Sequence, residues 1–209
     1  VSAGVAFLFV FIGKAYLADV AVGTAARLSA SGPQKESVAL LGSAIVKNPA
    51  EGRYYTRLGQ EQLGLLLTVE VKKSEADRDK DANSALYQQA LTSLREGVKR
   101  MPNDVLAVET LALANENGVP YVTASDASIL LATAFDNYKR ASDLEPVNPL
   151  LYVKQGQVKR LLADSKDEGA EKSALYEEAS AFFKEANAKK IDLASGYYNG
   201  IQFNIPGVD

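Results

Sequence analysis

The stretch AFDNYKRASDLEP, residues 134–146, decides the fold class. Ala134, Tyr138 and Ala141 stand at offsets of four and three residues, which places a small, a large and a small side chain on one helical face. Pro146 ends this helix, because proline lacks the N–H donor and its ring clashes with the preceding turn. The phrase recurs at Ser37, Leu41, Ala44 and Pro49; at Ala90, Leu94, Gly97 and Pro102; and at Ala179, Phe183 and Ala186, with Ile191 in place of the proline. Four such helices predict one unit used four times.

A second phrase belongs to the helix that precedes the first phrase. It comprises Tyr55, Leu58, Gly59 and Gln62, and again Tyr152, Gln155, Gly156 and Lys159. This is the spacing of the first helix of a tetratricopeptide repeat (TPR), so the chain resembles a TPR protein over about residues 18–192. Tyr replaces the usual Trp, and Ala112 replaces the glycine in the unit that starts at Val105. The resemblance implies an all-α, right-handed solenoid of about four helix pairs.

A further similarity covers the first third of the chain. The phrase RYYTRLG, residues 53–59, follows Asn48-Pro49 and an apolar helix. It is similar to the repeat region after the last membrane span of O-antigen ligase-like membrane proteins. That similarity implies an envelope or glycan-assembly setting.

Composition excludes several function classes. The net charge of -3 and the pI of about 5.2 provide no basic field for nucleic acid. The chain has no Cys and no His, which removes disulfides, thiolate ligands and the commonest general base. Glu61 and Glu70 sit on expected helix faces without a catalytic pairing, and no phosphate-binding or nucleophile-elbow motif is present. We therefore expect no enzymatic activity and no cofactor.

The first residues, VSAGVAFLFVFIG, contain no charge before Lys14. Thirteen helical residues rise about 20 Å, less than the roughly 30 Å of a bilayer core. The apolar side chains surround the helix, and such a helix requires burial on all sides. Three interpretations remain open: part of a membrane span, burial in the protein's own core, or burial among neighbouring copies. The initial Val also favours a processed chain.

The two ends form the expected assembly interface. Residues 193–209, LASGYYNGIQFNIPGVD, are unlike the polar helix that normally caps a solenoid. An apolar helix at residues 1–17 and this aromatic tail suit a head-to-tail contact, which forms filaments when it does not close. The interface residues are Val5, Phe7, Leu8, Phe9, Val10, Phe11, Ile12, Tyr197, Tyr198, Phe203 and Ile205.

Between the helices lie two charged insertions, of which one resembles a calcium loop. Asp77, Asp79 and Asp81 alternate as calcium ligands do, but Ala82 stands at the turn glycine and Gln88 at the bidentate glutamate. A solvated turn is therefore favoured over a metal site. After it, Ser125 is the expected N-cap of the helix that ends near Leu144.

The concave surface implied by the TPR resemblance is the second candidate site. The Lys and Asn that bind a peptide carboxylate in co-chaperones of this family are absent, with Thr56 and Gln60 at the matching positions. Tyr54, Arg57, Tyr152 and Lys154 remain as possible groove residues. The pattern favours a structural subunit that assembles with copies of itself outside the cell or on its surface. The alternative is a binding module anchored on the exterior face of a membrane that recruits envelope proteins.

Overall fold

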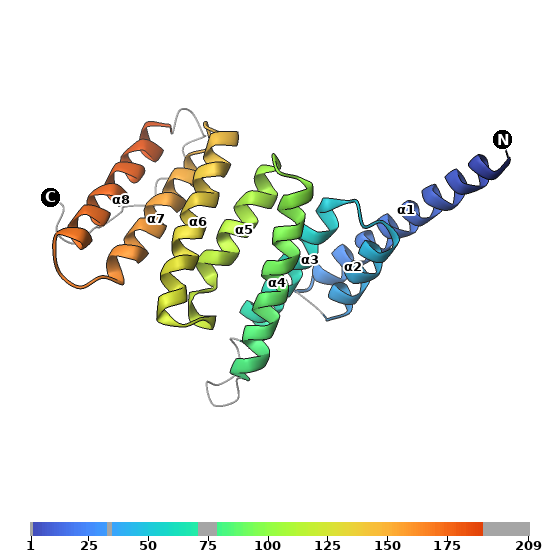
Figure 1. The fold of residues 1–209 in the computed structure, drawn as a ribbon, viewed down its shortest axis with the longest axis horizontal. Coiled ribbons are helices and arrows are strands. Elements are labelled where there is room, and N and C mark those ends of the chain that lie inside the picture. The colour runs from blue at the N-terminus through green and yellow to red at the C-terminus, as the bar shows by residue number, and fades with distance from the viewer. Residues whose placement is uncertain (1, 33–34, 71–78, 190–209) are drawn as a thin grey trace. The chain divides into compact units, whose positions relative to one another are not determined.

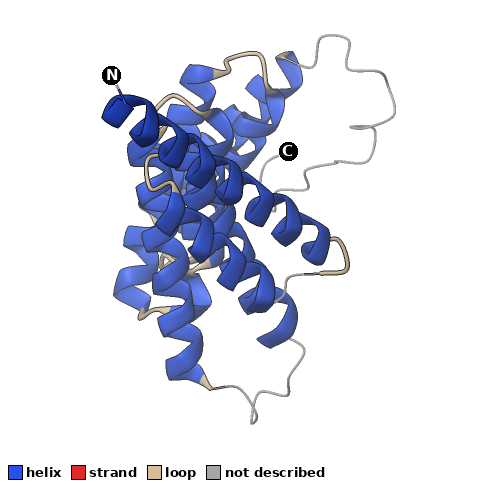
Figure 2. Ribbon diagram, turned by 90° about the vertical axis from the view of Figure 1, so that its right-hand side faces the viewer, coloured by secondary structure: helices blue, strands red, loops and turns tan. Residues whose placement is uncertain are grey.

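The computed structural model describes residues 2–32, 35–70 and 79–189. In these ranges the protein is helical throughout and has no strand (Figures 1 and 2). The elements are α1 (Ser2–Ser29), α2 (Lys35–Lys47), α3 (Gly52–Leu65), the π-helical turn η1 (Leu66–Glu70), α4 (Lys80–Arg100), α5 (Val105–Asn117), the 3-10 turn η3 (Val119–Tyr121), α6 (Ala124–Leu144), α7 (Pro149–Asp164) and α8 (Ala170–Ala188). The all-α class is confirmed. The right-handed solenoid stays a prediction.

The helices pack as neighbours along the chain. In the compact unit Val1–Ala114, α1 packs against α2, α2 against α3, and α3 against α4. In the unit Asn115–Asp209, α6 packs against α7, and α7 against α8. The boundary between the two units falls within α5, and the repeat domain predicted over residues 18–192 stays a prediction.

The repeated small-large-small phrase builds the helix pairs. Leu94 of α4 is fully buried, and a Cβ atom on Gly59 of α3 would lie within 3.0 Å of it. A Cβ atom on Gly156 of α7 would likewise lie within 3.0 Å of the Phe183 ring of α8. In these two pairs the glycine of the first helix therefore receives the large residue of the second, and a side chain at the glycine would force its neighbours to shift.

Helix ends follow local capping, with one correction. Asn148 caps α7 as its sequence position predicts, because its side chain accepts a hydrogen bond from Leu150 N. The predicted cap Ser125 is wrong: it lies inside α6, and Thr123 caps that helix by accepting from Asp126 N. Thr123 is the favoured N-cap because its hydroxyl also donates a hydrogen bond to the Asp126 carboxylate, at 2.7 Å.

The N-terminal helix is long but not apolar throughout. A single helix crosses the boundary at residues 17 and 18 that separates the expected apolar segment from the repeats. Lys14, Asp19 and Arg27 interrupt its apolar character. Among the helices of the described ranges, none has the length and hydropathy that a membrane crossing needs.

Candidate interaction surfaces

The two halves of α1 have different surroundings. Its C-terminal half packs on α2 and α3, where Ala18, Ala44 and Tyr54 form one buried cluster. Its N-terminal half extends past α2 (Figure 1). Large apolar side chains on the described part of this half and just beyond it are 45–67% exposed: Val10, Phe11, Ile12, Tyr16, Leu17 and Val20. Single exposed apolar residues are ordinary, but six within three turns form a patch that marks an interaction surface.

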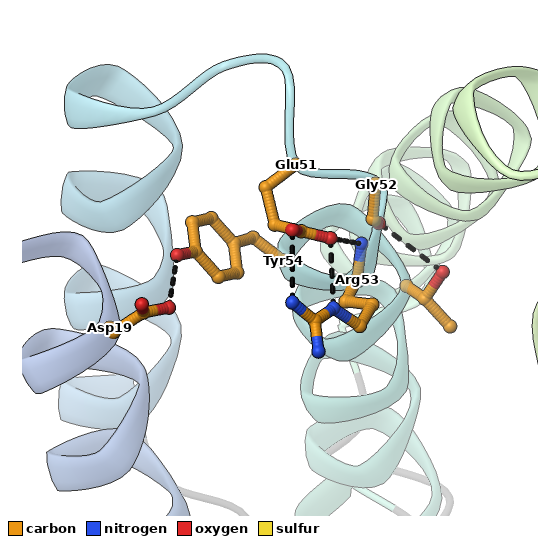
Figure 3. A network of polar contacts seen from close by, with 6 residues as sticks. Asp19, Glu51, Gly52, Arg53 and Tyr54 are labelled. Carbon is orange, nitrogen blue, oxygen red and sulfur yellow. Dashed lines mark hydrogen bonds and ion pairs between the residues drawn. The ribbon is translucent and has the colours of Figure 1, made fainter. Parts of the chain in front are cut away.

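Two polar contacts hold the C-terminal half of α1 in place. The Tyr54 hydroxyl of α3 donates a hydrogen bond to the Asp19 carboxylate of α1 (Figure 3). Burial, and then this bond to the Asp19 carboxylate, raises the pKa of Tyr54 to about 12.

Nearby, Glu51 caps α3 by accepting from Arg53 N at 3.1 Å, and its carboxylate pairs with the Arg53 guanidinium. The side-chain hydrogen bond from Arg53 lowers the pKa of Glu51.

The second contact is a series of hydrogen-bonded side chains across three helices, part-buried at Ser29 and buried at Ser37 and Glu61. Ser29 Oγ of α1 lies 3.0 Å from Ser37 Oγ of α2, and Ser37 Oγ donates to Glu61 Oε2 of α3 at 2.9 Å. The Glu61 side chain is only 6% exposed, and its other oxygen lies 3.2 Å from Arg57 Nη2. The sequence placed Glu61 on a helix face without a catalytic pairing and did not reveal these structural contacts. Ser37 carried the missed signal, because it stands where the other three copies have alanine.

A similar carboxylate lies in the second unit. Glu116 Oε2 accepts a hydrogen bond from the Tyr138 hydroxyl at 2.7 Å and lies 3.3 Å from Lys154 Nζ. The Glu116 side chain is 13% exposed and that of Lys154 is 31% exposed. The cluster therefore joins α6 and α7 through their shared acidic partner.

The structure divides the four predicted groove residues into two kinds. Tyr54 and Tyr152 are buried, and the Tyr152 hydroxyl donates to Pro146 O at 3.3 Å. Arg57 and Lys154 are partly exposed, and each pairs with a largely buried glutamate. The two cations thus keep a surface that a ligand can reach, whereas the two tyrosines take part in packing. The groove itself stays a prediction.

Some predicted interface residues lie outside the described part of the chain. These are Tyr197, Tyr198, Phe203 and Ile205 of the tail and the side chains of Val5, Phe7, Leu8 and Phe9. Asp77 of the calcium-like loop also lies there, whereas Asp79 caps α4 by accepting from Ala82 N at 2.9 Å. Across the ranges that the structure describes, no cluster of three or more metal-binding side chains occurs.

Comparison with solved structures supports the fold. The structure titled "Crystal structure of MamA" aligns with a TM-score of 0.58 at 14% identity, over 82% of this chain and 77% of that chain. The structure titled "MamA MSR-1 C2" aligns with a TM-score of 0.52 at 21% identity, over 82% of this chain and 76% of that one. The fold is TPR-like. No protein-family model and no curated protein matches the chain.

Proposed function

We propose that the protein is a non-enzymatic structural subunit, a TPR-like protein that assembles with copies of itself into an extracellular filament through α1. The observation that carries the proposal is the exposed apolar patch on α1, which water solvates poorly. Burying one large apolar side chain contributes about 1.5–3 kcal/mol. The TPR-like fold supports the coarser part, a role in protein interaction or as a scaffold.

Negative-stain electron microscopy in detergent-free buffer tests the filament. The intact chain is compared with the same chain lacking residues 1–17, and circular dichroism verifies that the shortened chain stays helical. We expect regular filaments from the intact chain and dispersed particles from the shortened one. Irregular aggregates from the intact chain would contradict the filament proposal.

The exposed patch also favours one alternative, a binding module that α1 holds at a membrane and that recruits envelope or glycan-assembly proteins. Apolar helix faces insert between lipid headgroups as well as between proteins. Co-sedimentation with lipid vesicles separates the two functions. The alternative requires the intact chain to pellet with vesicles and the chain without residues 1–17 to stay in solution.

The extracellular location is a separate part of the proposal and has its own test. Antibodies against the repeat region should label intact, unpermeabilised cells that express the protein. Labelling only after permeabilisation would refute an exterior location for both the filament and the membrane-held module.

A further inference from the structure

The packing seam between α1 and α2 continues beyond the end of α2. Ala18 and Ala25, two turns apart on α1, are fully buried. Phe11 precedes Ala18 by the same two turns, so it lies on the same face of the helix. Yet Phe11 is 57% exposed. The face that packs on α2 therefore reaches a position where nothing in the chain's described ranges covers it.

The register of the two helices shows where α2 ends along α1. At one end Ser29 faces Ser37, and at the other Ala18 and Ala44 share a buried cluster. Helix α2 ends three residues after Ala44, at Lys47, within about a turn of the level of Ala18. α1 has 28 residues and α2 has 13. Their lengths of about 42 and 20 Å leave room beside α1 for one further helix of about four turns in line with α2.

We call the N-terminal half of α1, which extends past α2, the free half. Its chemistry indicates which kind of helix packs beside it. Residues Ser2 to Gly13 of α1 carry no charge. A charged helix packed against them would therefore lose hydration without gaining an ion pair. Among the helices that the structure describes, this same segment of α1 is the longest uncharged run. A second copy of the free half carries the same apolar surface, so both copies bury that surface in one contact. This self-complementary arrangement is the usual basis of a two-fold pair.

The position of α2 decides the direction of the second copy. A parallel, in-register α1 from a neighbour would continue through the space that α2 occupies. An antiparallel α1 meets the C-terminal end of α2 with its own N-terminal end, where the helix dipoles attract. We propose that the free halves of α1 from two copies pack antiparallel along this seam, each in line with the other's α2. This inference rests on the proposed self-assembly through α1 and makes the pair its building block, because a two-fold contact closes and a filament then requires a further contact between pairs.

Cysteine cross-linking tests the geometry directly, because the 209-residue chain contains no cysteine. Positions 4, 7, 11 and 15 follow the seam at helical spacing. The variants Gly4→Cys and Ala15→Cys, at opposite ends of the seam, are oxidised separately and as an equimolar mixture of full-length chains. An antiparallel pair brings position 4 of one copy near position 15 of the other. We expect the mixture to give several-fold more cross-linked dimer than either variant alone.

Each other outcome has a definite meaning. Strong self-cross-linking of Gly4→Cys and of Ala15→Cys would show a parallel pair and overturn the inference. A chain that sediments as an assembly but cross-links at none of the four positions would overturn the seam contact while the proposed self-assembly stands. A chain that sediments as a monomer would overturn both. Cross-linking of Phe11→Cys to Tyr198→Cys would instead place the C-terminal tail of a neighbour on the seam and refute the pair.

A matched pair of charge substitutions provides an independent readout. Phe11 and Ile129 are both large, apolar and more than half exposed on a helix, but Ile129 lies on α6 in the other unit. Phe11→Asp should weaken association by about tenfold or more, since aromatic residues dominate the free energy of association at interface centres. Ile129→Asp should leave the dissociation constant from sedimentation equilibrium unchanged. Equal effects of the two substitutions would overturn the inference.

Discussion

At the residue scale, the repeat depends on a fit between a glycine and a large side chain. A Cβ atom on Gly59 would lie 2.4 Å from Leu94 Cγ and 3.0 Å from the backbone oxygen of Ala90, so a side chain there meets both a side chain and the backbone. The sequence predicts such a site because the small and large positions recur at fixed offsets in successive helices. The spacing alone could not show which glycine receives which side chain, since that depends on helix packing.

Two glycine substitutions in the same unit measure this fit. Gly59→Ala should lower the free energy of unfolding by about 1–3 kcal/mol, because the added methyl group has no space. Gly42→Ala, in α2, should raise it by about 0.5–1 kcal/mol, because a Cβ atom there meets nothing within 4 Å and alanine favours the helix. Urea denaturation followed by circular dichroism compares the two. Equal stability of the variants would contradict the proposed fit.

The raised pKa of Tyr54 predicts a loss of stability at alkaline pH. Its folded pKa of about 12 exceeds the ordinary tyrosine pKa of 10.0, so its contribution to stability is fully present below pH 10 and is lost as the pH rises through 12. Two pKa units correspond to at most about 3 kcal/mol. Burial raises the pKa of Tyr87 to about 12 as well, so both tyrosines contribute to the same decline.

Tyr54→Phe removes the Tyr54 titration as a whole, which combines the burial of the hydroxyl with its bond to Asp19. The variant should lose about half of the decline in unfolding free energy between about pH 10 and 12. Denaturation curves at a series of pH values provide the measurement. An unchanged decline would mean that the Tyr54 hydroxyl does not stabilise the folded unit. The sequence could not predict this contact, because Asp19 and Tyr54 lie in helices that only the fold brings together.

At the element scale, the C-terminal ends of the helices were more predictable than their starts. Proline and the small-large-small phrase predicted the ends of α2, α4 and α6, each of which ends two residues before Pro49, Pro102 or Pro146. The start of α6 was missed because Ser125 and Thr123 are both acceptable caps, and only the bond of Thr123 to Asp126 distinguishes them. For α1, composition predicted an apolar surface, but which side is covered depends on where α2 ends.

The two halves of α1 should differ in hydrogen exchange. Residues 18–29 are held by Tyr54 and by the Ser29, Ser37 and Glu61 contacts, whereas isolated helices of about fifteen residues are marginal in water. In dilute, dissociated protein the amides of residues 4–16 should therefore exchange much faster than those of residues 18–29. At assembling concentrations the difference should shrink. Mass spectrometry of peptic fragments reads both halves, and fast exchange of residues 4–16 in the assembly would exclude this half from the interface.

At the scale of the whole molecule, the exposed apolar patch overlaps a stretch of the chain that carries no charge. The net charge of -3 is small, and the ion pairs in each unit join residues of that unit. Association through this patch therefore does not depend on attraction between charges, and the remaining weak repulsion between copies is screened by salt.

Salt then has a predictable effect on assembly. Sodium sulfate should lower the protein concentration at which assembly begins, because sulfate is excluded from protein surfaces and strengthens apolar burial. Sodium chloride at the same ionic strength should have a smaller effect in the same direction, since it acts mainly by screening. Light scattering across a concentration series gives the onset in each salt. An onset that rises steadily with sodium chloride would show that ion pairs hold the copies together, because screening weakens such pairs and leaves apolar contacts intact.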